Sequence, residues 1–202
     1  MWAESHADLD VSRETLERLK ALEALTLKWS KAINLVSAHS ADDIWGRHIL
    51  DSLQLNKLIP HNVSKFADLG SGGGFPALVL AACRPNANFS LLESDQRKCV
   101  FLQTASREMG LSVQVINSRI ESAPPMNAEI VTARALAPLE KLLNLAERHC
   151  ASVSTCFFLK GQNAEQEVLD AKKTWNFDCI LHQSNTSVEG RVLEIGTFKR
   201  VR

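Results

Sequence analysis

The sequence lacks the features of several protein classes. Its five cysteines stand singly, without a Cys-x-x-Cys pair, which argues against a disulfide framework and against a zinc site. No stretch is long and apolar enough to cross a bilayer, and residues 1–10 carry acidic residues where a signal peptide has an apolar run. We therefore expect a cytoplasmic protein without a membrane partner or a metal.

The chain also has no net charge, because 23 Lys and Arg residues balance 23 Asp and Glu residues. This balance neither supports nor excludes a nucleic-acid partner, since phosphate binding depends on local basic patches. A length of 202 residues suits one globular domain with a short extension. No exposed apolar stripe stands out, so a monomer is expected.

Hydrophobic periodicity divides the chain at about residue 60. Residues 1–60 predict a helical extension packed on the core, with one helix after the N-cap Ser12 and another from a capping box at Ser40 to about Leu58. Residues 61–202 alternate between strands and helices, which predicts a mostly parallel sheet. The last two strands predict an antiparallel edge hairpin. Strands are expected at 65–69, 88–93, 112–117, 128–133, 154–159, 178–183 and 191–198, and helices near 76–83, 95–109, 138–149 and 163–174.

A glycine-rich turn follows the first expected strand, with the sequence Asp68-Leu69-Gly70-Ser71-Gly72-Gly73-Gly74-Phe75-Pro76. In an open α/β sheet this turn lies at the carboxyl edge, where ligands bind. Phe75 stands where a dinucleotide fingerprint needs its third glycine, and the Gly-Lys-Ser/Thr ending of a P-loop is absent. The remaining Asp-x-Gly-x-Gly-x-Gly pattern is that of class I methyltransferases, which use S-adenosylmethionine. Pro76 is expected at the first position of the next helix.

A carboxylate closes the second expected strand. Glu93 could accept hydrogen bonds from both ribose hydroxyls of an adenosyl ligand. Asp95 is the rival, although capping the following helix suits it better. If the glycines are considered without Glu93, the alternative to a cofactor site is an ordinary turn that binds no ligand.

The sequence resembles the bacterial 16S ribosomal RNA guanine-N7 methyltransferases, the glucose-inhibited division protein B family, over residues 16–198. The resemblance implies the class I S-adenosylmethionine-dependent methyltransferase fold, which is Rossmann-like with a seven-stranded sheet. It also implies methylation of N7 of one guanine in 16S ribosomal RNA, as free RNA or in the small ribosomal subunit. Ala77 departs from the pattern, because many relatives have glycine after the proline. The segments that carry the resemblance are 31–35, 47–53, 68–76, 91–95, 118–121, 131–137 and 159–161.

The resemblance also implies site residues. Guanine N7 has a free lone pair, so holding the base in line with the methyl group needs no general base. Arg134 and Lys160 are the candidates for holding it, and their separate roles stay open. Contacts with the cofactor are expected from Gly70, Ser71, Gly72, Phe75, Glu93, Ile120, Glu121 and Arg134.

A second group of polar residues, Asn34, Arg47, His48 and Asp51, precedes the glycine turn. His48 and Asp51 are neighbours on one expected helix. The functional hypothesis places this region, with Asn34 and His48 as catalytic candidates, over the cofactor mouth. The alternative is a hydrogen-bond network that packs helices together.

Several other functional interpretations of the sequence stay open. Arg97, Lys98 and the basic segment 191–202 are candidates for contact with RNA, and a solvated surface is their alternative. The chain could instead methylate a small molecule or a protein, or bind the cofactor without turnover as a ribosome-assembly factor. A nicotinamide-dependent oxidoreductase is disfavoured by the failed dinucleotide pattern.

Overall fold

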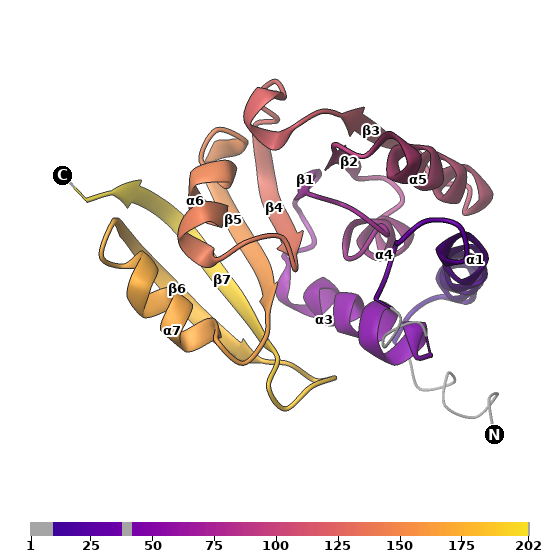
Figure 1. Cartoon of the computed structure of the whole chain (residues 1–202), viewed down its shortest axis with the longest axis horizontal. Coiled ribbons are helices and arrows are strands. Elements are labelled where there is room, and N and C mark those ends of the chain that lie inside the picture. Colours follow the sequence, from indigo (N-terminus) through magenta and orange to yellow (C-terminus); the bar gives the residue numbers. More distant parts are fainter. Residues whose placement is uncertain (1–9, 38–41, 202) are drawn as a thin grey trace.

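The computed structural model describes residues 10–37 and 42–201, whose strands form one sheet (Figure 1). The strands are β1 (Lys65–Leu69), β2 (Asn88–Glu93), β3 (Val113–Asn117), β4 (Ala128–Arg134), β5 (Cys150–Lys160), β6 (Trp175–Gln183) and β7 (Arg191–Arg200). They lie in the order β3-β2-β1-β4-β5-β7-β6. β1 to β5 are parallel, and β7 is antiparallel to both β5 and β6. The predicted mostly parallel seven-stranded sheet with an antiparallel edge hairpin is confirmed.

Helices cover both faces of this sheet. They are α1 (Arg13–Ser30), the π-helix η1 (Trp45–Leu50), α3 (Asp51–Leu58), α4 (Ala77–Cys83), α5 (Gln96–Glu108), the short 3-10 helix η2 (Ile120–Ser122), α6 (Leu139–Ala146) and α7 (Ala164–Ala171).

Alternating side chains of the strands contribute to two hydrophobic layers. In β1, Phe66 belongs to one layer, while Ala67 and Leu69 belong to the other, because successive side chains of a strand point to opposite faces. Residues of α1, α3, α4 and α5 complete the Phe66 layer, and residues of α6 and α7 complete the second. The carboxyl ends of β1, β2 and β4 thus rest on a core that is packed from both sides.

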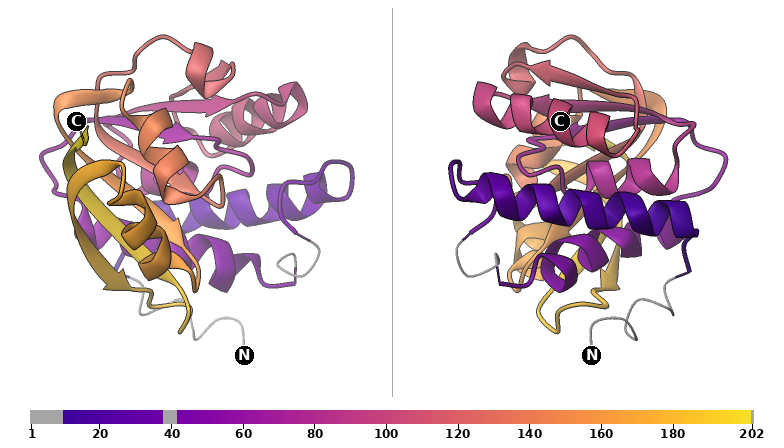
Figure 2. Two further views of the ribbon diagram at one scale, coloured as in Figure 1. Left: turned by 60° about the vertical axis from the view of Figure 1, so that its left-hand side comes forward. Right: turned by 90° about the vertical axis from the view of Figure 1, so that its right-hand side faces the viewer.

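The N-terminal helices share the first of these layers. α1 begins where the sequence predicts, since the Oγ of Ser12 accepts from the Thr15 N–H at 3.1 Å. Leu19 and Leu22 are fully buried, and α1 lies across α4 and α5 (Figure 2, right). The division of the chain at residue 60 stays a prediction, because these helices bury their apolar side chains together with those of α4.

The predicted second helix begins later than expected. Ser40 lies outside the described residues, and Asp42 and Asp43 form a turn. The Oδ1 of Asp43 accepts from the Gly46 N–H at 2.8 Å, and η1 then runs directly into α3. A Cβ on Gly46 would lie 2.4 Å from that carboxylate, so glycine permits this tight start. The wider π turn of η1 leaves no signal in the hydrophobic spacing, and such turns are frequent at functional sites.

Other boundaries differ by a few residues. Pro76 is the N-cap of α4, one position before the predicted N1. β5 begins at Cys150, with a register shift in its pairing with β4, and β6 begins at Trp175. Within the described ranges, none of the helices has the length and hydropathy needed to cross a membrane.

Candidate active site

The glycine turn joins β1 to α4 at the carboxyl edge of the sheet. Gly74 has a φ of 83°, and a Cβ there would lie 2.5 Å from a methyl carbon of Leu78. At Gly73 the restriction is steric, because an added Cβ would lie 3.1 Å from the carbonyl oxygen of Leu35. The Ser71 N–H donates to the Leu92 carbonyl at 3.0 Å, which ties the turn to β2. The turn therefore packs tightly on α4, on β2 and on the loop that follows α1.

Glu93 lies beside this turn at the end of β2. Its side chain is buried, its Oε2 accepts from the Gly72 N–H at 2.9 Å, and its Oε1 accepts from the Asp95 N–H at 2.8 Å. Each carboxylate oxygen can accept more than one hydrogen bond, so capacity for ribose hydroxyls remains. Asp95 is the N-cap of α5, accepting from the Arg97 N–H at 2.8 Å, as the sequence predicts.

A hollow of about 330 Å³ opens between the turn and the loops that follow β2, β3 and β4. This volume lies in the range of about 300–1,000 Å³ that is typical of small-ligand sites. Ser71 and Phe75 do not line it, because both side chains are buried below the turn. Among the predicted cofactor residues, those that line it are Gly70, Gly72, Glu93, Ile120, Glu121 and Arg134.

A larger hollow of about 820 Å³ lies where β6 begins and β7 ends. Because β7 runs antiparallel to β5, that point is the amino edge of the sheet. Its lining consists of residues of 172–178 and 199–201, and includes none of the predicted catalytic or cofactor residues. We therefore place the candidate active site in the smaller hollow.

Asp68 is buried directly below the glycine turn. Its Oδ1 accepts from the Thr132 Oγ1 at 2.6 Å, whereas its Oδ2 has no hydrogen-bond partner among the described residues. Burial raises the pKa of Asp68 to about 6, although the hydrogen bonds from Thr132 and Ser71 oppose this increase. The carboxyl group therefore changes its charge close to neutral pH.

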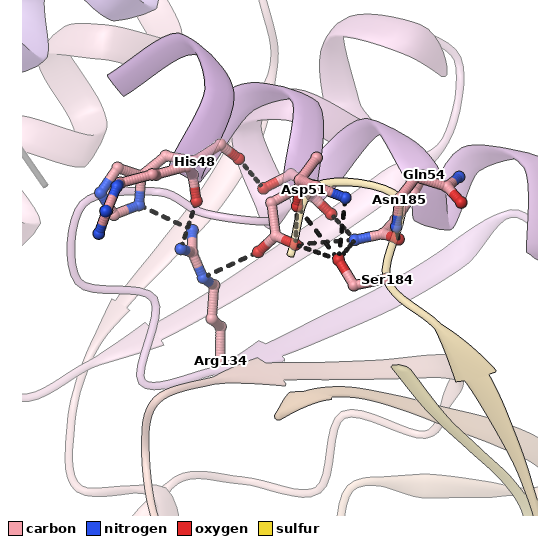
Figure 3. Close-up of polar contacts among 9 residues, drawn as sticks. His48, Asp51, Gln54, Arg134, Ser184 and Asn185 are labelled. Atoms are coloured by element: carbon pink, nitrogen blue, oxygen red, sulfur yellow. Dashed lines mark hydrogen bonds and ion pairs between the residues drawn. The ribbon is translucent and has the colours of Figure 1, made fainter. Parts of the chain in front are cut away.

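Arg134, which lines the hollow, meets His48 (Figure 3). The Nη1 of Arg134 lies 2.8 Å from the Nδ1 of His48, whose ring packs against Phe75 at a centroid distance of 5.0 Å. Burial, together with the charge of Arg134, lowers the pKa of His48 to about 4. The imidazole is thus neutral at pH 7, so Nδ1 accepts from Arg134 and Nε2 carries the hydrogen. The buried Nε2–H has no partner within the described residues.

Two further groups hold the Arg134 guanidinium. Its Nη2 donates to the Arg47 carbonyl at 2.6 Å, and its Nε lies 3.4 Å from the Oδ2 of Asp51. The structure thus brings Arg47, His48 and Asp51 together around Arg134, a contact that the sequence did not indicate. Asn34 is exposed in the loop after α1 and takes no part in this network, although its neighbour Leu35 touches the glycine turn.

Lys160 lies at the end of β5 but is already engaged in an ion pair. Its Nζ donates to the Oε2 of Glu167 and to the Ala137 carbonyl, both at 2.6 Å. Its side chain is only 8% exposed, and Lys160 is not among the described residues that line the hollow. The ammonium therefore supports the loop after β4.

Comparison with known proteins identifies the family of the chain. The family model described as "GidB: rRNA small subunit methyltransferase G" matches residues 15–195. The chain belongs to this family. Relatives named "Ribosomal RNA small subunit methyltransferase G" include those of Ruegeria sp. (strain TM1040), 47% identical over 198 residues, and of Paramagnetospirillum magneticum, 47% identical over 193 residues. The first alignment covers 96% of both chains, and the second covers 95% of this chain and 93% of the relative.

Solved structures of methyltransferases share the fold of this member of the methyltransferase G family. A 16S rRNA methyltransferase of T. thermophilus in complex with AdoMet and guanosine has a TM-score of 0.55 and 18% identity, over 73% of this chain and 38% of that chain. A tRNA methyltransferase of Aquifex aeolicus has a TM-score of 0.53 and 17% identity, over 76% of this chain and 69% of that chain. At such identities the likeness shows the shared fold.

Some residues at this candidate site were missed by sequence reasoning. Arg119 and Lys141 line the hollow. Arg119 stands in the segment 118–121 but was not singled out, and Lys141 lies outside the segments that carry the resemblance. Gln54, Ser184 and Thr186 surround Asp51. The spacing of Gln54 three residues after Asp51 could have indicated the first contact. The other two residues lie on the β6–β7 loop, which the sequence shows only as a polar connection.

Proposed function

We propose that this member of the family transfers the methyl group of S-adenosylmethionine to N7 of a guanine in 16S ribosomal RNA. The observation that carries the proposal is the arrangement of Gly72, Glu93 and Arg134 around one hollow at the carboxyl edge of the sheet. Membership of the methyltransferase G family and the names of the relatives support ribosomal RNA as the substrate.

The residues present suit the proposed cofactor. Glu93 offers a buried carboxylate for the ribose hydroxyls, and Ile120 and Glu121 offer an apolar side chain and main-chain groups for the adenine. Asp68, whose pKa is raised by burial, lies below the turn, and the cationic methionine part of the ligand is expected to pack against that turn. S-adenosylmethionine supplies an electrophilic methyl group on a sulfonium sulfur.

The mechanism that we propose is one of positioning. The N7 lone pair of guanine is free, so the chain has no proton to remove before transfer. The neutral state of His48 agrees with this, since at pH 7 its Nδ1 is occupied as an acceptor for Arg134. Arg134 retains N–H groups beyond those that bind Arg47, His48 and Asp51, and these can orient the base or a phosphate. Alignment of N7 with the methyl–sulfur bond and exclusion of water then supply the rate enhancement.

The target guanine is expected in a loop or in an extruded state. In an A-form helix N7 lies in a deep and narrow groove that protein side chains do not read. A base taken out of its stack exposes its N7 to an active site.

Labelled S-adenosylmethionine and small ribosomal subunits that lack the modification test this function. We expect label in 16S ribosomal RNA, on N7 of one guanine after mapping, and a large loss of incorporation with Arg134→Ala. Label that appears on a protein or a small molecule, or that never appears although the cofactor binds, would contradict the proposal.

We also propose a metal-free monomer that acts in the cytoplasm, with residues 1–60 as an extension of the domain over 61–202. Attack by the N7 lone pair needs no metal-activated nucleophile, which supports the first part. Light scattering during size-exclusion chromatography tests the monomer, and activity after dialysis against a chelator tests the absence of a metal requirement.

A further inference from the structure

We propose that the β6–β7 loop, through Ser184 and Thr186, is a positioning element of the methyl-transfer site that orients Arg134 by way of Asp51. The inference rests on the proposed function, because Arg134 matters only where a substrate is held. It joins a segment at the antiparallel edge of the sheet to the end of β4.

The Asp51 carboxylate stands between the loop and Arg134 (Figure 3). Its Oδ1 accepts from the Thr186 Oγ1 at 2.9 Å and from the Ser184 Oγ at 3.4 Å. The same oxygen accepts from the Gln54 Nε2 at 2.8 Å. Its Oδ2 is the oxygen that faces the Nε of Arg134, at 3.4 Å. Donors gathered on one oxygen fix the rotation of the carboxylate, which aims the other oxygen at the guanidinium.

The loop is itself fastened to α3 in a defined conformation. The Asn185 N–H donates to the Oε1 of Gln54 at 3.1 Å, so Gln54 binds the loop and Asp51 together. The Ser184 N–H donates to the Gly190 carbonyl at 3.1 Å, which closes the loop on itself. Gln54 and Ser184 are both buried. The loop is thus a fixed support for Asp51.

The ion pair between Arg134 and Asp51 is largely buried, which strengthens the effect of the loop on Arg134. The side chains of Arg134 and Asp51 are 19% and 16% exposed, so water screens their interaction only partly. Arg134 lines the hollow, whereas Ser184 and Thr186 do not. The loop residues therefore act on the reaction through Asp51 and are positioning residues.

The test removes one hydroxyl with little change of shape. Thr186 is exposed, so Thr186→Val should fold normally. We expect kcat to fall by about 3- to 10-fold, the effect of one modest hydrogen bond, while KM for S-adenosylmethionine and the melting temperature stay near wild type. The matched control is Thr197→Val, an exposed threonine on β7 of the same hairpin, which should leave kcat unchanged.

A double variant shows whether the effect passes through Arg134. In Arg134→Lys the planar guanidinium is absent, so Asp51 has no fork to orient. Adding Thr186→Val to this variant should then cause no further loss of kcat. An unchanged kcat in Thr186→Val alone, or the same loss in both backgrounds, would overturn the inference.

Nuclear magnetic resonance makes the test independent of turnover. The Nε–H resonance of Arg134 should shift or broaden in Thr186→Val and stay in place in Thr197→Val. An unmoved resonance in Thr186→Val overturns the positioning inference even if wild-type protein methylates ribosomal RNA. A moved resonance in a protein that fails to methylate ribosomal RNA supports the positioning and rejects the proposed function.

Discussion

The Nε2 of His149 donates to the main-chain carbonyl of Ile120 over 3.0 Å. His149 is fully buried in the connection between α6 and β5, and Ile120 lines the hollow. The preceding residue, Arg148, donates to the Glu121 carbonyl in the same way. Two consecutive side chains, Arg148 and His149, therefore bind the main chain of Ile120 and Glu121, the turn that we expect to contact the adenine.

Replacing His149 by Ala should loosen this turn. We expect binding of S-adenosylhomocysteine to weaken by about 3- to 10-fold, and the free energy of unfolding to fall by about 1–3 kcal/mol, because the Ile120 carbonyl loses its donor inside the protein. Titration calorimetry and denaturant unfolding measure both effects. His61→Ala, at an exposed histidine after α3, is the control. Wild-type affinity in a destabilised His149→Ala protein would show that the turn does not need this support.

Changing Glu93 to Gln should weaken the cofactor itself. An amide puts a donor group where the Gly72 N–H and two ribose hydroxyls need acceptors, so we expect a loss of about 10- to 100-fold in affinity for S-adenosylmethionine. Glu129→Gln is the matched control, because Glu129 also accepts from main-chain N–H groups, of Ser64 and Lys65, but at the amino edge of the sheet. Equal affinities for the two variants would remove Glu93 from the cofactor site.

The raised pKa of Asp68 predicts pH-dependent binding. The folded protein without ligand keeps a proton on Asp68 up to about pH 6, whereas a cationic ligand favours the ionised form. Affinity for S-adenosylmethionine should therefore fall as the pH drops through about 6, and stay level above 7. Calorimetry from pH 5 to 8 measures this profile, and Asp68→Asn should flatten it. The stability of the ligand-free protein has the opposite sign, since the cost of burying the charge is present above pH 6 and relieved below it.

Lys160 gives a prediction about stability. Lys160→Met leaves the Glu167 carboxylate, which also accepts from the Leu139 N–H at 2.7 Å, without its cation. We expect the free energy of unfolding to fall by about 1–3 kcal/mol, and adding Glu167→Gln should recover part of that loss. Denaturant unfolding of the wild-type protein, the single variant and the double variant measures both effects. A Lys160→Met protein that is as stable as wild type yet inactive would restore Lys160 as a residue that touches the guanine.

The sequence predicted the site best where local chemistry determines structure. The ends of β1 and β2 were predicted correctly, because apolar runs there stop at a glycine turn and at Glu93. Ser12 and Asp95 were recognised as caps because their side chains bind main-chain N–H groups only a few residues away.

Contacts across the fold were beyond reach of the same reasoning. Lys160 was placed correctly at the end of a strand, but the direction of its side chain depends on Glu167 and on the loop after β4. Thr186 meets Asp51 only because β7 turns back beside β5. The π-helix η1 was missed for a similar reason, since Arg47 and His48 within it serve as acceptors for Arg134 on a distant strand.

The glycine turn and the segment after α1 approach each other closely at Gly73. A Cβ on Gly73 would lie 3.1 Å from the Leu35 carbonyl oxygen, so no side chain fits between the two segments. A displacement of the glycine turn towards Leu35 would therefore displace this segment as well, and would reach the exposed Asn34 on the outer surface.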